Sequence, residues 1–219
     1  TGIANISVEL DNSGTIQVET GELAITNSTT FTNEIGGVVQ GVGIFTLPDL
    51  VNNTNNGVFA PGASPGTLTV QGDFSSTSDA VLDAELDGLI QGTEYDLLAI
   101  IGNADFDGDV QIALGFTPSV NDEFIIATTT NTINTCNLPA TATSTIGGYD
   151  YQFDIVCRNG NEVVLTVTGI TVGIDSFDED ELSIKLYPNP ASDQITISLD
   201  TRETTTVQLY NMLGSLVLE

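Results

Sequence analysis

Internal repetition in the first third of the chain limits the folds that are open to it. Three segments align, DNSGTIQVETGELAI from Asp11, NEIGGVVQGVGIFTL from Asn33 and NNGVFAPGASPGTLTV from Asn55. Each opens with asparagine and glycine and carries two short β-type runs separated by a glycine-containing turn. The units recur roughly every 20 to 23 residues. This period is expected of stacked solenoid coils, in which one unit cannot bury its apolar face alone.

The repeat predicts which residues stack in successive coils. Two internal apolar ladders are expected, with Ile16, Val39 and Val58 in one and Leu23, Phe45 and Leu68 in the other. Asn12, Asn33 and Asn56 are predicted to lie at turns, where asparagine tolerates a left-handed backbone and pairs with its own main chain. The expected fold is all-β, a right-handed parallel β-helix over the first 75 or so residues.

Longer strands follow Gly72 and continue the β-structure as a cap that ends the domain at residue 173. They are AVLDAELDGL, DLLAIIGNADF, DVQIALGF and DEFIIATTT, each bounded by Gly, Asn, Asp or Pro. The stretch from Asn55 to Thr128, through PGASPGTL, EYDLL and GFTP, resembles the end of the passenger domain in β-helical autotransporter-type adhesins. The resemblance implies a secreted β-helix with a capping region and no particular ligand.

The charge balance restricts the partners of the chain. Thirty carboxylates face three cations, Arg158, Lys185 and Arg202, and there is no histidine. The resulting negative field makes nucleic acid and anionic membranes poor partners.

No run of 18 apolar residues is present, so no transmembrane helix and no membrane insertion are expected. The opening TGIANISVEL lacks the regions of a signal peptide, so the chain is expected to be a fragment whose start is missing.

Two cysteines, Cys136 and Cys157, lie 21 positions apart in a polar, Thr-rich region. Without histidine or a second cysteine pair, this spacing does not indicate a metal site. A disulfide would close the loop, contribute about 3 kcal/mol and indicate an oxidising compartment. Two separately buried thiols are the alternative.

Catalysis is not expected, although β-helices also carry polysaccharide lyases and glycosidases. Asp83, Glu85 and Asp87 alternate with apolar residues, which predicts one solvated strand face. Residues 1–173 hold a single cation, Arg158, where lyase chemistry usually needs one to remove a proton or neutralise an acid sugar. The absence of histidine excludes a Ser/His triad and a His metal site.

The strongest metal candidate is a weak calcium site at Asp105, Asp107 and Asp109 in NADFDGDV; no other cofactor is expected. Counted from Asn103, the stretch matches the start of a calcium loop up to Gly108. The twelfth position is Leu114, where a bidentate Glu is needed. Asp178, Glu179, Asp180 and Glu181 are the alternative, but consecutive carboxylates without a glycine turn do not form such a loop.

The acidic run DSFDEDE, Asp175 to Glu181, is interpreted as a solvated linker over 174–181. Beyond it, residues 182–219 resemble the C-terminal sorting domain of type IX secretion substrates in Bacteroidota, with a partial Ig-like β-sandwich fold. The matching positions are Leu186, Tyr187, Pro188, Asn189 and Pro190, followed by the strand ITISL and the turn glycine Gly214. The final strands and basic C-terminal residues of the family are not found, so the sorting domain is interpreted as truncated. An ordinary Ig-like module with a Pro-rich turn is the alternative.

The sequence therefore predicts a non-catalytic, extracellular or cell-surface β-helical protein, adhesin-like or structural. Its expected partners are the type IX secretion machinery, through residues 182–219, and an extracellular glycan or a host or matrix surface. Attachment to the outer membrane after secretion is the expected localisation. One alternative is a fragment of a carbohydrate-active β-helix enzyme whose catalytic coils lie upstream of Thr1, and another is a plain structural stalk.

Overall fold

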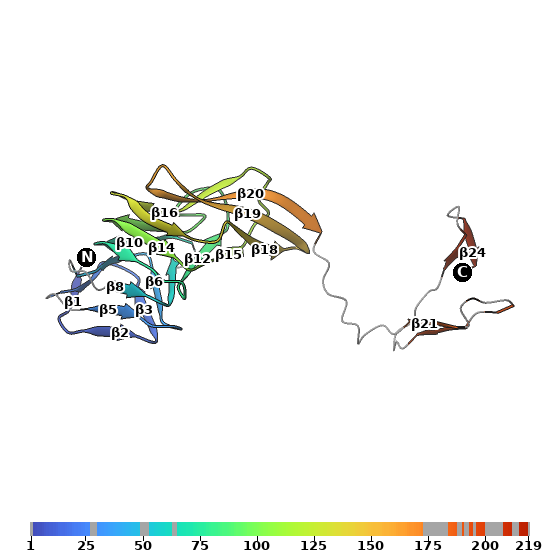
Figure 1. Cartoon of the computed structure of the whole chain (residues 1–219), viewed down its shortest axis with the longest axis horizontal. Helices are drawn as coiled ribbons and strands as arrows, with labels where there is room; N and C mark the ends of the chain where they lie inside the picture. The colour runs from blue at the N-terminus through green and yellow to red at the C-terminus, as the bar shows by residue number, and fades with distance from the viewer. Residues whose placement is uncertain are drawn as a thin grey trace. The chain divides into compact units, whose positions relative to one another are not determined.

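The computed structural model consists of β-strands joined by turns, and the residues that it describes contain no helix (Figure 1). These residues are 2–26, 30–48, 53–62, 65–172, 184–187, 190, 193–194, 196–199, 208–211 and 215–218. The chain divides into two compact units, Thr1–Gly173 and Ile174–Glu219.

Four sheets build the first unit. The nine-stranded sheet contains, in spatial order, β1 (Ile3–Ile6), β4 (Glu22–Ile25), β7 (Ile44–Thr46), β10 (Thr67–Gln71), β13 (Leu97–Ile101), β16 (Glu123–Thr129), β20 (Glu162–Val172), β19 (Tyr149–Arg158) and β18 (Thr141–Ile146). The five-stranded sheet contains β15 (Asp109–Leu114), β12 (Val81–Leu86), β9 (Val58–Pro61), β6 (Val38–Gly41) and β3 (Thr15–Val18). Two three-stranded sheets contain β2 (Leu10–Asn12), β5 (Phe31–Asn33) and β8 (Asn53–Asn55), and β11 (Phe74–Ser75), β14 (Ala104–Asp107) and β17 (Ile133–Asn137).

The chain visits these sheets in a fixed order. Each turn of the chain contributes one strand to the nine-stranded sheet, one to a three-stranded sheet and one to the five-stranded sheet, from β1, β2 and β3 to β13, β14 and β15. The strand pairs formed along this path are parallel. The stacked parallel sheets confirm the all-β prediction and are consistent with a solenoid, because each turn packs on the one before it.

A buried row of asparagines explains the Asn and Gly signature of the repeat. Asn12 lies opposite Asn33, and Asn33 opposite Asn55. The Nδ2 group of Asn12 donates to Oδ1 of Asn33 at 2.8 Å, and Nδ2 of Asn33 donates to Oδ1 of Asn55 at 2.8 Å. Gly57 stands beside this row because a Cβ there would collide with the carbonyl oxygen of Gly37. The predicted pairing with the local main chain is present at Asn12, which ends β2 and accepts a hydrogen bond from the Gly14 amide in the bend that follows. The third member of the row is Asn55, not the predicted Asn56, and the row lies inside the fold.

The apolar ladders differ from the prediction at their third position. Val39 lies opposite Ile16 as expected, but its other neighbour is Phe59. Phe59 is buried, whereas Val58 is half-buried and lies opposite Val38. The reason is that the side chains alternate along β9, so a shift of one residue exchanges the two faces of the strand.

The second ladder shows the same kind of correction. Leu23 lies opposite Phe45 as predicted, but Phe45 lies opposite Val70, two residues beyond Leu68. Leu68 is also buried and lies opposite Leu98. A shift of two residues keeps the same face, so Leu68 is an internal residue of a neighbouring ladder.

Stacked phenylalanines run through the core of the first unit. The ring centroids of Phe31 and Phe45 are 5.1 Å apart, those of Phe45 and Phe59 6.4 Å, and those of Phe59 and Phe74 5.0 Å. Phe106 continues the stack at 5.6 Å from Phe74. Edge-to-face and tilted ring pairs at these distances add to the energy of burial.

The parallel stack ends in an antiparallel region. β20 pairs antiparallel with β16, and β19 and β18 follow in the same sheet. A disulfide joins Cys136 on β17 to Cys157 on β19, with Cα atoms 6.4 Å apart. It cross-links a three-stranded sheet to the antiparallel strands, so the alternative of two separate thiols is not realised.

The second unit contains two antiparallel strand pairs among its described residues. β21 (Ile184–Tyr187) pairs with β22 (Thr196–Leu199), and β23 (Leu209–Tyr210) pairs with β24 (Leu216–Leu218). The predicted acidic linker 174–181, with its four candidate calcium ligands, and the sorting positions Pro188, Asn189 and Gly214 lie outside the described residues.

Candidate functional site: a polar hollow and a C-terminal sorting segment

The outer face of the five-stranded sheet carries the acidic residues predicted to be solvated. On β12, Leu82, Ala84 and Leu86 point inward and are buried. Asp83 and Glu85 take the alternate positions, but they are half-buried, and Asp87 beyond the end of the strand is exposed. The predicted alternation is present, but Asp83 and Glu85 are less exposed than the predicted solvated face implies.

Asp83 and Glu85 line a hollow of about 420 Å³. Its lining also includes Gln17 on β3, Gln40 on β6 and Ala60 on β9. Gln17 lies opposite Gln40, and Gln40 opposite Ala60. Because Leu82 lies opposite Phe59, the same register leads from Ala60 to Asp83 on β12. Ala113 of β15 lies opposite Glu85 and also lines the hollow. The hollow therefore spans five neighbouring parallel strands, which at about 4.8 Å per strand corresponds to roughly 19 Å.

Asp96 is the most buried acidic side chain of the hollow, with 4% of its surface exposed. Its Oδ1 accepts a hydrogen bond from the Gly66 amide at 2.8 Å, and its Oδ2 accepts one from the Glu85 amide at 2.9 Å. Gly62 passes beside it with a φ of +99°, and a Cβ at this position would collide with Oδ1 of Asp96. Asp96 thus ties the turn before β10 to β12.

Burial shapes the titration of these carboxyls. Burial raises the pKa of Asp96 to about 6, against the lowering effect of its two amide donors, and the negative charges of Glu85 and Asp83 raise it further. Burial also raises the pKa of Asp83. The hollow consequently resists additional negative charge, so an anionic ligand is disfavoured.

Sequence reasoning missed Asp96 as a site residue. It stands in the quoted EYDLL segment between Tyr95 and Leu97, where an acidic residue in an apolar run signals a buried carboxylate. Its partners Gly66 and Glu85 are 30 and 11 residues away in the chain, so local pattern could not identify them.

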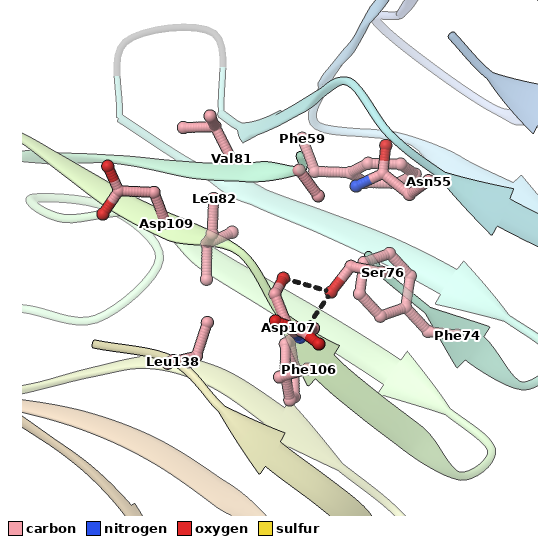
Figure 2. A pocket seen from close by; sticks show the side chains of 11 residues that line it. Asn55, Phe59, Phe74, Ser76, Val81, Leu82, Phe106, Asp107, Asp109 and Leu138 are labelled. Carbon is pink, nitrogen blue, oxygen red and sulfur yellow. Dashed lines mark hydrogen bonds between the residues drawn. The ribbon is translucent and has the colours of Figure 1, made fainter. Parts of the chain in front are cut away.

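The predicted calcium ligands do not form a metal centre. Among the described residues, no group of three acidic or cysteine side chains is placed to hold an ion. Asp107 accepts from the Gly108 amide and Asp109 from the Val110 amide, each at 2.8 Å. Figure 2 shows the Ser76 hydroxyl hydrogen-bonded to the main chain of Asp107, where it donates to the carbonyl oxygen and accepts from the amide. Asp107 and Asp109 line a void of only about 10 Å³. The carboxylates of Asp107 and Asp109 instead accept hydrogen bonds from local backbone amides.

The sorting positions that the structure describes lie at the end of β21. Leu186 and Tyr187 pair with Ile197 and Thr196 of β22, and Tyr187 is 53% exposed. Pro190 follows at an exposed bend. The strand thus ends at Tyr187, as the sequence predicts.

Residues 185–219 match the family model described as secretion system C-terminal sorting domain. The match indicates export through the type IX secretion machinery and a secreted, surface-exported protein of the Bacteroidota type. No curated protein matches the chain. In the part of the chain that the structure describes, no helix has the length and apolar character needed to cross a membrane.

Proposed function

We propose that this chain is a non-catalytic cell-surface protein, adhesin-like or structural, in which residues 1–173 are the exported passenger and the C-terminal segment is its sorting signal. The observation that carries the proposal is the sorting-domain match at residues 185–219. The disulfide between Cys136 and Cys157 supports it, because such bonds form and persist in oxidising compartments.

The passenger is proposed to be a right-handed β-helix that ends in the antiparallel strands β18 to β20. The support is the fixed order in which the chain visits its parallel sheets. Connections between parallel strands of one sheet are right-handed in almost all proteins, because a right-twisted strand packs back onto its sheet only in that sense. Repeating right-handed crossovers generate a right-handed coil.

A non-catalytic role is favoured by the bonding of Asp96. Both of its carboxyl oxygens accept backbone hydrogen bonds, so this carboxylate has a structural role in linking two segments of the fold. The competing function is a carbohydrate-active enzyme. One observation favours it: Asp83 and Glu85 are alternate residues of one strand, so their Cα atoms lie about 6.7 Å apart, a spacing compatible with the roughly 6.5–9.5 Å between the carboxyl groups of inverting glycoside hydrolases. Release of reducing sugar from polysaccharides by the purified chain, lost in Glu85→Gln, would establish the enzyme.

Export is tested by deleting residues 185–219 from the gene in a bacterium with a type IX system. The truncated protein is expected to stay inside the cell, whereas the full chain becomes accessible to protease added outside. The matched control is Asp83→Asn in the full chain, which leaves the sorting segment intact and is expected to reach the surface normally. Normal surface delivery after the deletion would refute the sorting role.

A further inference from the structure

The hollow on the five-stranded sheet combines two kinds of polar group along one line. Side-chain amides, Gln17 and Gln40, lie toward β3, and carboxylates, Asp83 and Glu85, lie toward β15. Ala60 stands between them and leaves the middle open. Amides donate to and accept from hydroxyl groups, whereas carboxylates accept from hydroxyls and bind cations.

Asp83 and Asp96 have no cationic side chain among residues 1–173 to balance them. Arg158 is the one cation in residues 1–173, and it bonds to Glu123 at 2.8 Å and to Glu162 at 3.2 Å. Asp96 is 4% exposed and receives only uncharged amide donors. A buried carboxylate beside other carboxylates is costly to ionise, and a bound cation relieves both the desolvation and the repulsion. The hollow is therefore electrostatically complementary to a positively charged ligand.

The position of the hollow favours a glycan over a peptide. It lies across the face of β6, β9 and β12, which are internal strands of their sheet. Their backbone groups are already paired with neighbouring strands, so an extended peptide finds no free edge to join. Recognition must come from side chains, and the row from Gln17 to Asp83 presents these at the regular spacing of the strands.

We propose that this hollow binds a linear polysaccharide that carries free amino groups, with its hydroxyls on Gln17 and Gln40 and a protonated amine on Asp83. The inference rests on the proposed function, since a surface-exported protein meets glycans outside the cell, and it names the ligand class of that function.

The test uses the full 219-residue chain and two probes with the same sugar backbone, a glucosamine hexamer with free amines and its fully N-acetylated form, in which the amines are uncharged amides. Binding is measured by calorimetry at mildly acidic pH and about 0.15 M ionic strength, where long-range attraction is screened. The amino form is expected to bind at least tenfold more tightly. Asp83→Asn is expected to weaken binding about tenfold and Gln40→Ala several-fold, since each removes a hydrogen-bonding partner of the ligand.

Asp11→Asn is the matched control, because it removes the same charge from an exposed position on β2, in another sheet. Its affinity is expected to equal that of the unmodified chain. Equal affinity for both hexamers would overturn the proposal, and so would equal losses of affinity in Asp11→Asn and Asp83→Asn. Either result would mean that the hollow does not bind the protonated amine specifically. Tighter binding of oligolysine without dependence on Gln40 would assign the hollow to basic peptides instead. None of these outcomes alters the export assay, so the two proposals fail separately.

Discussion

At the scale of single residues, the buried asparagines show how polar groups stabilise the parallel stack. Asn33 is completely buried, and its Nδ2 group donates to Oδ1 of Asn55 and to the carbonyl oxygens of Gly37 and Val58. Its Oδ1 accepts from Asn12. Asn12 and Asn33 thus each form hydrogen bonds with the next coil as well as with their own coil. The row therefore helps to fix which residues of neighbouring coils lie opposite one another.

Asn33→Ala is expected to lower the free energy of unfolding by about 3 kcal/mol, because it leaves buried donors and acceptors without partners. Urea denaturation followed by circular dichroism measures the change. Asn5→Ala, at an exposed position on β1, is the control and is expected to change stability by less than about 0.5 kcal/mol. Equal effects of the two substitutions would contradict the role of the row.

Asp96 predicts a pH dependence of stability. Its pKa in the folded chain is about 6, above its ordinary value, so the fold favours the protonated form. Its contribution to stability is therefore complete at low pH and is lost as the pH rises through 6. Between pH 4 and pH 7, this loss amounts to about 2 kcal/mol. Asp96→Asn does not titrate, so the unmodified chain should lose stability relative to this variant over the same interval. Parallel pH profiles for the two proteins would show that the pKa is not raised.

At the scale of elements, the sequence predicted parallel coils because the Asn and Gly positions recur, but it did not predict the register of every strand. Val39 is 23 residues after Ile16, whereas Phe59 is only 20 residues after Val39. A repeat of uniform length therefore cannot predict both of these pairings. In the third coil, Val58 and Phe59 are adjacent and both apolar, so alternation alone does not tell which one points inward. Asp96 and the partners that bury it depend on the same tertiary register.

A pair of substitutions on β9 tests this register. Phe59→Ala removes a buried ring packed between Phe45 and Phe74 and is expected to cost about 4 kcal/mol. Val58→Ala, on the half-buried outer face, is expected to cost about 1 kcal/mol or less. Chemical denaturation of the two variants measures both values. The reverse order would mean that Val58 is the internal residue.

At the scale of the whole molecule, composition predicted the charge and the internal repeat predicted the class of fold. The sorting segment was predictable because its signal lies in a short contiguous stretch. The hollow was not predictable in this way, because it draws Gln17, Gln40 and Asp83 from three separate coils. Their proximity follows from stacking, which a linear reading of the chain does not supply.

The net charge of −27 predicts that salt stabilises this protein. Residues 1–173 contain 21 carboxylates and one cation, a net charge of −20, so folding gathers like charges into one compact unit and the repulsion opposes it. Raising the ionic strength from about 0.01 M to about 0.3 M shortens the screening length several-fold and weakens this repulsion. The melting temperature is therefore expected to rise with sodium chloride, and a variant with Glu9, Asp11 and Glu19 changed to their amides should melt higher than the unmodified chain at low salt. The advantage of the variant should shrink at high salt, because screening then removes the repulsion in both proteins. A melting temperature that falls with salt would instead mean that attractive ion pairs such as Arg158 with Glu123 dominate the electrostatics of the fold.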